Sequence, residues 1–194
     1  MGKRIGITGN IGAGKTTVCR EFERLGIPVY YADERAKQLM VSHADLRASV
    51  AARFGTESYH PGGNVNRPYL AERVFNDPAA LAELNALVHP VVAADAAQWH
   101  LAQDCPYTLH EAAILLEIGA AAEYAAMIVV DCPYPTRLAR VTVRDGISAE
   151  AFAARAARQW SDERKRAAAD HLIVNDGKAL ILPQVLRVDR ILAG

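Results

Sequence analysis

One glycine-rich segment of the chain has residue types and spacing that suit phosphate binding. Residues 9–16 read G-N-I-G-A-G-K-T and fit the pattern G-x-x-x-x-G-K-[ST]. In such a loop the glycines permit a tight turn that aims backbone N–H groups at phosphate oxygens, and the following helix start adds donors. Lys15 would neutralise the β- and γ-phosphates, and the Thr16 hydroxyl would complete a Mg²⁺ shell. The segment predicts an ATP-type site, and an incidental glycine-rich turn is the alternative. The predicted nucleotide-binding residues here are Asn10, Ile11, Gly12, Ala13, Gly14, Lys15, Thr16 and Thr17.

Acidic residues stand where three apolar, strand-like runs end. They are Asp33, Glu111 and Asp131, and the carboxyl ends of parallel strands flank the ligand crevice. Asp33 is the candidate for receiving or orienting a hydroxyl proton, with a helix N-cap as the alternative. Glu111 suits either a place beside the ligands of Mg²⁺ or a structural role. For Asp131 we favour an ordinary turn residue, because Cys132-Pro133 follows it.

Arginines recur with helical spacing in the last third of the chain. Arg137, Arg140 and Arg144 are spaced i, i+3 and i+7, and Arg155 and Arg158 repeat the i, i+3 spacing. The first three predict one helix face that presents three guanidinium groups. Such a face can close over phosphates and stabilise the transferred group, or it can be a solvated surface.

Two basic side chains lie in the long segment between the second and third strands. Arg67 could clamp a substrate phosphate or pair with Glu72. For His89, which precedes Pro90, we favour a packed histidine over a catalytic one.

Short apolar runs alternate with helical periodicity, which indicates an α/β fold with a five-stranded parallel sheet. A helix is predicted from Lys15 to Gly26, and another near the end, with Ile181, Val185 and Val188 on one face. The predicted strands are Arg4–Thr8, Val29–Ala32, Tyr107–Glu111, Met127–Asp131 and His171–Asn175.

A helical insertion is predicted after the second strand, because the segment to the third strand is too long for a simple crossover. Within it, Asp77-Pro78 predicts a helix start, His89-Pro90 a helix end, and Gly55–Asn66 a loop. We predict a nucleotide-binding core from residues 1–34, 106–136 and 169–194. An acceptor domain is predicted at 35–105 and a lid at 137–168.

Composition excludes several classes of protein. The 194 residues carry 22 Lys+Arg and 22 Asp+Glu, so the zero net charge argues against broad nucleic-acid binding. Three cysteines without a CxxC pair predict neither a disulfide framework nor a zinc cluster, and they favour a reducing cytoplasm. The start of the chain does not read as a signal peptide, and no apolar run suits a membrane helix. We expect a monomer or weak homo-oligomer without a membrane partner.

Several short motifs recur along the chain together with the loop. They are Tyr31-Ala32-Asp33, Asn66-Arg67, Val88-His89-Pro90, Glu111–Glu117, Arg140, Arg144-Asp145, Gln159, Ala169-Asp170 and Asn175-Asp176-Gly177. Taken together, these residues resemble dephospho-CoA kinase, a family of P-loop kinases, nearly from end to end. One departure is that the family commonly has Pro-Leu-Leu where residues 113–115 read Ala-Ile-Leu.

The resemblance implies phosphorylation of the ribose 3′-hydroxyl of dephospho-CoA by ATP with Mg²⁺. Asp33 would be the catalytic carboxylate, aided by Lys15 and Arg140. Arg140 and Arg144 would belong to the lid over ATP, and Asn175 would lie near adenine. Asp33, Arg67, His89 and Glu111 would serve the acceptor. A nucleoside or nucleoside-monophosphate kinase is the nearest alternative, and a nucleotide-gated binding module is a second.

Overall fold

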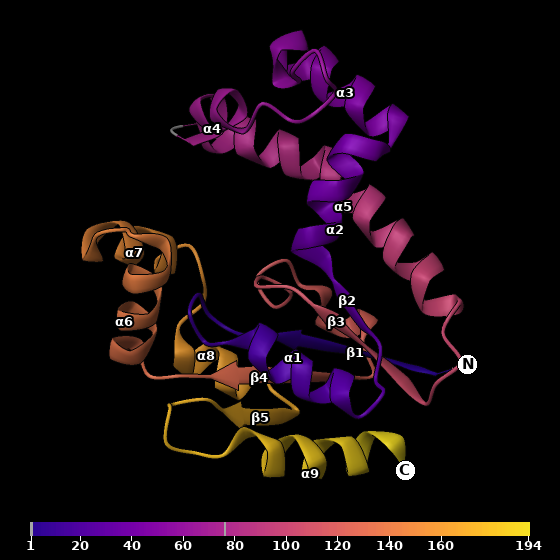
Figure 1. Ribbon diagram of the computed structural model, residues 1–194, viewed down its shortest axis with the longest axis vertical. Helices are drawn as coiled ribbons and strands as arrows, with labels where there is room; N and C mark the ends of the chain where they lie inside the picture. The colour runs from indigo at the N-terminus through magenta and orange to yellow at the C-terminus, as the bar shows by residue number, and fades with distance from the viewer. Residues whose placement is uncertain (1, 76) are drawn as a thin grey trace. The chain divides into compact units, whose positions relative to one another are not determined.

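The five predicted strands form one sheet in the computed structural model, which describes residues 2–75 and 77–194 (Figure 1). Every pair of neighbours is parallel, and the strand order is β2-β3-β1-β4-β5. Each strand lies within one residue of its prediction at either end. The strands are β1 Lys3–Thr8, β2 Val29–Tyr31, β3 Tyr107–Glu111, β4 Ala126–Asp131 and β5 His171–Val174.

The register brings several strand ends to one edge of the sheet. Ile7 of β1 and Tyr31 of β2 both pair with Glu111, the last residue of β3. On the other side of β1, Thr8 pairs with Val129 of β4. The segment that follows β1 therefore leaves the sheet beside the end of β3, which places residues from separate parts of the chain around one loop.

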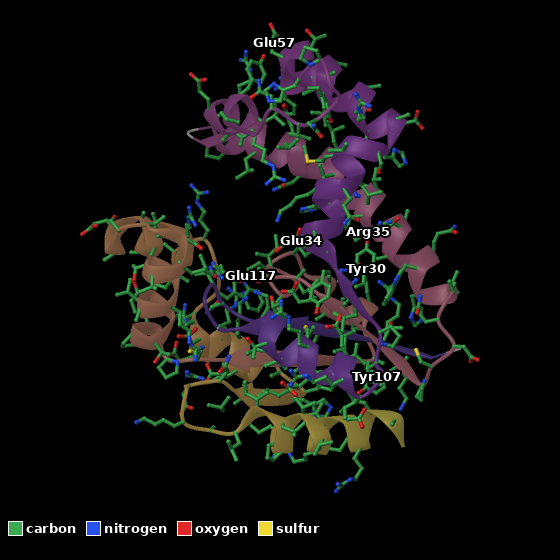
Figure 2. The ribbon with its side chains drawn as sticks, viewed as in Figure 1. Tyr30, Glu34, Arg35, Glu57, Tyr107 and Glu117 are labelled. Carbon is green, nitrogen blue, oxygen red and sulfur yellow. The ribbon has the colours of Figure 1, made fainter. Side chains whose placement is uncertain are left out.

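One face of the sheet is covered by α1 (Lys15–Arg24) and α9 (Ile181–Ala193), which share a hydrophobic core with the strands. The Tyr107 hydroxyl, labelled in Figure 2, donates a 2.6 Å hydrogen bond to Asp189 and ties β3 to α9. Both predicted helices are confirmed, although α1 ends at Arg24 rather than Gly26. The helical residues of this core are Val18, Cys19, Phe22, Val185, Val188 and Leu192.

The opposite face carries an aromatic group around His110. Successive residues of a strand point to opposite faces, so His110 faces away from the core that holds Leu109. Its ring lies between Tyr30, with centroids 5.1 Å apart, and Tyr124, with centroids 5.5 Å apart. Burial, with a smaller contribution from Arg4, lowers the pKa of His110 to about 4, so its ring is neutral at neutral pH.

Three helices and a short turn complete the part of the chain that follows β3. The turn η2 (Ala120–Glu123) precedes β4. After β4 come α6 (Tyr134–Asp145), α7 (Ala149–Ala156) and α8 (Asp162–Ala167). Serine hydroxyls cap the last two helices, since Ser148 accepts from Ala151 N and Ser161 accepts from Arg164 N, each at 3.2 Å.

The chain divides into two compact units. Residues up to Tyr31 and from His100 onward form the first, and Ala32–Trp99 form the second. The second unit contains α2 (Ala32–Ser42), α3 (Ala44–Phe54), the turn η1 (Thr56–Ser58), α4 (Arg67–Phe75) and nearly all of α5 (Pro78–Leu101). None of the helices that the structure describes is long and apolar enough to cross a membrane.

The predicted helix end at His89-Pro90 is wrong, because α5 continues through Pro90 to Leu101. Its predicted start is correct, since the Asp77 carboxylate accepts from Ala79 N at 2.9 Å and from Ala80 N at 3.0 Å. Proline removes one helical hydrogen bond and crowds the preceding turn. Val88, Val92 and Ala96 recur every four residues on the buried side of α5, and their burial stabilises the helix on both sides of the proline.

Candidate functional site

The segment between β1 and α1 forms a loop with unused backbone donors. Gly14 has φ +86° and ψ 33°, a left-handed conformation that favours glycine, and it precedes the first helical residue. Ala13 N donates to Asn10 O within the loop at 2.9 Å. In the described part of the chain, the N–H groups of Gly12, Gly14, Lys15 and Thr16 have no acceptor. Four donors at a helix start form a cradle suited to phosphate oxygens.

Lys15 adds a charge to this cradle. Its ammonium donates to Gly9 O at 3.2 Å and lies 3.6 Å from Glu111 Oε1. Both side chains are largely buried, with 13% of Lys15 and 8% of Glu111 exposed. The structure therefore brings Lys15, at the start of α1, next to Glu111 at the end of β3. One turn along α1, burial raises the pKa of the Cys19 thiol, with a further rise from Glu111, so Cys19 stays protonated.

Arg140 and Asn175 come together behind the loop. Arg140 donates to Asn175 O at 3.0 Å and, more weakly, to Asn175 Oδ1 at 3.4 Å. The amide of Asn175, which directly follows β5, donates to Ala13 O at 2.8 Å. Asn175 is 7% exposed, so this side chain connects the loop to α6 from a buried position. A phosphate bound to the loop would lie near the guanidinium of Arg140.

The other arginines of α6 differ from the predicted three-guanidinium face. Arg137 is 3% exposed and makes an ion pair with Asp162, so it is a buried structural residue. Arg144 is exposed and pairs with the adjacent Asp145 at 2.7 Å, and Arg155 also contacts Asp145 at 3.4 Å. The i, i+3, i+7 spacing correctly placed the residues on one helix, but their partners assign them different roles.

Asp131, for which an ordinary turn residue was favoured, makes an ion pair with a nearby helix. It ends β4, and its Oδ2 lies 2.9 Å from Nε of Arg166, a residue of α8. Thr16 and Thr17, by contrast, are exposed at the first turn of α1. Among the residues that the structure describes, no group of three His, Cys, Asp or Glu side chains could hold a metal. Mg²⁺ in phosphotransferases needs few protein ligands, because nucleotide phosphates and water complete its shell. One accessible hydroxyl at Thr16 fits that requirement.

The second unit carries the remaining predicted residues. Asp33 is exposed in the first turn of α2, which begins directly after β2, and it lies inside the helix rather than at an N-cap. Arg67, at the start of α4, lines a cavity of about 470 Å³ within this unit. His89 is exposed on α5 and is not among the described residues of that lining. Besides Arg67 the cavity is lined by Lys37, Met40, Val41, Asn64, Val65, Leu70, Ala71, Val74 and Leu84.

Several polar residues near the loop, some buried and some half-buried, were not predicted as part of the site. Gln159 accepts a hydrogen bond from Ile11 N at 2.8 Å, and Asp162 accepts one from the Asn10 amide at 2.5 Å. Lys165 is 1% exposed and pairs with Glu117 at 3.0 Å. Asn10, predicted to bind nucleotide, therefore has its amide nitrogen engaged within the protein. The available signal was weak: Gln159 and Lys165 are polar residues in an alanine-rich stretch.

Comparison with known proteins decides which kinase family has this arrangement. The family model described as dephospho-CoA kinase matches residues 3–180. The chain belongs to the dephospho-CoA kinase family. A relative from Salinibacter ruber, a dephospho-CoA kinase, is 43% identical over 176 residues, which cover 89% of this chain and 88% of the relative.

Solved structures agree with this assignment. A dephospho-CoA kinase from Campylobacter jejuni superposes with a TM-score of 0.73 at 25% identity, covering 100% of this chain and 98% of the other. A crystal structure of a Thermus thermophilus protein gives 0.87 at 31% identity, with coverage of 98% and 97%. The predicted family, α/β P-loop fold and kinase activity are confirmed. The chain is thus an ATP-dependent phosphotransferase with an alcohol group as acceptor.

Proposed function

We propose that this kinase transfers the γ-phosphoryl group of ATP to the ribose 3′-hydroxyl of dephospho-CoA, giving CoA and ADP. The observation that carries the proposal is the phosphate cradle, in which four backbone N–H groups and Lys15 lie at the carboxyl ends of β1 and β3. Such a site binds the phosphates of a nucleotide. Family membership then identifies the acceptor.

In this proposal the nucleotide is held by the first unit. Residues 10–17 surround the phosphates. Lys15 gives up part of its contact with Glu111 and neutralises the charge of the phosphates. The Thr16 hydroxyl would hold Mg²⁺, which would supply neutralisation of the charge that develops on the phosphates. Arg140 would face the transferred group, and Asn175 would lie near adenine; their contacts with each other and with Ala13 O, which keep both beside the loop, support this proposal. Arg144 belongs to a lid formed by residues 137–168.

Asp33 is the proposed catalytic carboxylate. It comes two residues after Tyr31, whose register partner is Glu111, so the chain leaves the nucleotide-binding sheet immediately before it. An exposed carboxylate in this position can accept the hydroxyl proton as the phosphoryl group is transferred. A loose phosphoryl-transfer transition state requires little base strength, so orientation of the hydroxyl is the larger contribution.

The second unit is the proposed acceptor domain. Its cavity has mostly apolar walls, with the cationic side chains of Lys37 and Arg67 in its lining. That combination suits a long, partly apolar substrate that carries phosphate groups. Arg67 is the stronger acceptor-binding candidate because it lines the cavity, whereas His89 and Glu111 remain predictions from the family resemblance.

The cellular setting is also part of the proposal. The cysteines Cys19, Cys105 and Cys132 are free thiols, two of them buried, which supports a reducing cytoplasm. We predict a monomer or weak homo-oligomer.

A competition among acceptors tests the substrate assignment. The purified protein, ATP and Mg²⁺ are incubated with dephospho-CoA, AMP and nucleosides in parallel, and products are identified by mass spectrometry. We expect one added phosphate on dephospho-CoA, released as CoA. Phosphorylation of a mononucleotide alone would replace the assignment with a nucleoside or nucleoside-monophosphate kinase. Tight ATP binding without any phosphorylated product would support a nucleotide-gated binding module.

A further inference from the structure

The first half of the phosphate loop is held by one later stretch of chain, residues 159–165, which we call the anchoring segment. Ile11 N donates to Gln159 Oε1 at 2.8 Å, and the Asn10 amide donates to Asp162 Oδ1 at 2.5 Å. Neither bond occupies a donor that is available for phosphate. Instead, the anchoring segment orients the backbone that leads into those donors.

A buried ion pair fixes the same two loop residues from the side of α6. Arg137 binds both carboxylate oxygens of Asp162, at 2.9 and 2.8 Å, and is 3% exposed. It also donates to Ile11 O at 3.4 Å and to Cys132 O at 2.9 Å. Ile11 is therefore bonded at both its N–H and its carbonyl group. Both bonds come from the single nitrogen Nη2, and because they join charged groups they are stronger than neutral hydrogen bonds, so they restrain Asp162.

A second buried ion pair holds the C-terminal end of the anchoring segment. Lys165 is 1% exposed, and its ammonium lies 3.0 Å from Glu117 (labelled in Figure 2) and 2.9 Å from Ala113 O. Thr8, the last residue of β1, donates to the same carbonyl at 3.1 Å. Burial lowers the pKa of Lys165, and the Glu117 carboxylate opposes that shift. The pair holds the segment against the turn that follows β3.

Gln159 joins these two groups of contacts. Its Oε1 accepts from Ile11 N, and its Nε2 donates to Ala113 O at 3.4 Å. We propose that Gln159 is a positioning residue for phosphoryl transfer, acting through the Ile11 backbone to set the orientation of the adjacent Gly12 N–H toward the phosphates. Gln159 comes three residues after Ala156, the last residue of α7, so it also links the end of that helix to the loop.

The two ends of the loop depend on different supports. Gly14 is held by the helix that follows it, because its carbonyl accepts from Thr17 N at 3.0 Å and from Val18 N at 3.2 Å. Gly12 follows Ile11, whose conformation depends on the anchoring segment. Loss of the Gln159 side chain therefore leaves the N–H groups at the helix end of the cradle in place and shifts the Gly12 N–H group at the other end. Because a displacement near 1 Å can lower a rate by about 100-fold, transfer is more sensitive than binding to such a shift.

The test compares two glutamine substitutions that remove similar hydrogen bonds. Gln159→Met keeps the size of the side chain but removes its acceptor and donor. Gln184→Met is the matched control, because Gln184 Oε1 accepts from Val174 N at 2.8 Å and its Nε2 donates to Val174 O at 3.0 Å, bracing α9 on β5. We expect Gln159→Met to lower kcat by about 10- to 100-fold while KM for ATP changes less than about threefold. Gln184→Met should keep both constants, and the two variants should have similar melting temperatures.

Gln159→Glu tests which hydrogen bond matters. Its carboxylate keeps an acceptor for Ile11 N, while Thr8 and Lys165 still donate to Ala113 O. We expect kcat of Gln159→Glu to be at least about threefold higher than that of Gln159→Met. If Gln159→Met does not fold, Gln159→Glu is compared with the wild-type protein instead. The proposal is overturned if Gln159→Met retains kcat within about twofold or changes KM for ATP alone. It is also overturned if Gln184→Met is equally slow, or if Gln159→Glu shows no recovery.

Discussion

Replacement of Gly14 by alanine perturbs both the shape of the phosphate loop and the residues behind it. Gly14 lies in the left-handed region with φ +86° and ψ 33°. A Cβ added there would contact the Asn175 amide nitrogen and approach Arg140 to 3.7 Å. Asn175 would have to move, and it could no longer donate to Ala13 O.

The expected loss of stability is the sum of two effects. An alanine in the left-handed region costs about 1–2 kcal/mol. Ala13 is 1% exposed, so a carbonyl that loses its 2.8 Å partner there costs about 1–3 kcal/mol more. We therefore expect Gly14→Ala to lower the free energy of unfolding by about 2–5 kcal/mol. For a chain of this size that corresponds to a drop in Tm of roughly 5–15 °C.

Gly26→Ala is the matched control. Gly26 has φ +84°, and a Cβ there would meet nothing within 4 Å. It therefore has the backbone cost of about 1–2 kcal/mol alone, and the reduced entropy of the unfolded chain affects both variants equally.

Urea unfolding followed by circular dichroism gives the difference between the two variants, which we expect to be about 1–3 kcal/mol. ATP affinity should fall in Gly14→Ala and not in Gly26→Ala. Equal stabilities within about 0.5 kcal/mol would refute the contribution of the Asn175 contact.

Three further perturbations address the acceptor, the chemistry and the fold. Asp33→Asn should lower kcat by at least about 100-fold with little change in ATP affinity, whereas Glu34→Gln, in the same exposed turn, should not. Near-normal turnover of Asp33→Asn would remove its catalytic role. Arg67→Met should raise KM for dephospho-CoA by about 10-fold with a smaller change in kcat. Arg53→Met is its control, because Arg53 pairs with Glu83, and equal effects would exclude Arg67 from substrate binding. The pKa of His110 is lowered from 6.5 to about 4, so the unfolded chain binds the proton first. The free energy of unfolding should then fall by about 3 kcal/mol more in the wild-type protein than in His110→Phe as the pH drops from 6.5 to 4. Urea melts of the two proteins at a series of pH values measure this difference. Parallel pH profiles for the two proteins would contradict this.

The sequence was informative wherever a short stretch determines its own conformation. The glycines and Lys15 of the loop lie next to one another in the chain, and α1 begins at Lys15 as predicted. Strand limits could be predicted because buried parallel strands are continuous apolar runs bounded by turn residues. The helix through Pro90 could not, because packing of a buried face over both sides of the proline outweighs a local helix-breaking preference.

The support of the loop could not be predicted, because it depends on contacts between distant parts of the chain. Gln159 is 148 residues from Ile11, and Lys165 is 52 residues from Ala113. The same limit applies to the arginines of α6. Arg137 and Arg140 have the same residue type on the same helix, yet one faces Asp162 and the other Asn175. Spacing identifies a common face, while the partner that determines the role of each side chain comes from the tertiary structure.

The central place of β1 in the sheet has a consequence for the order of folding. β1 is made first, but its partners β3 and β4 extend to Glu111 and Asp131. During synthesis, β1, the strand that leads into the phosphate loop, therefore has no partner strand until more than half of the chain has been made. The second unit is continuous from Ala32 to Trp99, so its whole sequence is synthesised before β3 appears. Long-range parallel pairing is slow to form. We expect the proposed acceptor domain to fold early and the nucleotide site to be assembled late, when β4 pairs with a strand that was synthesised long before it.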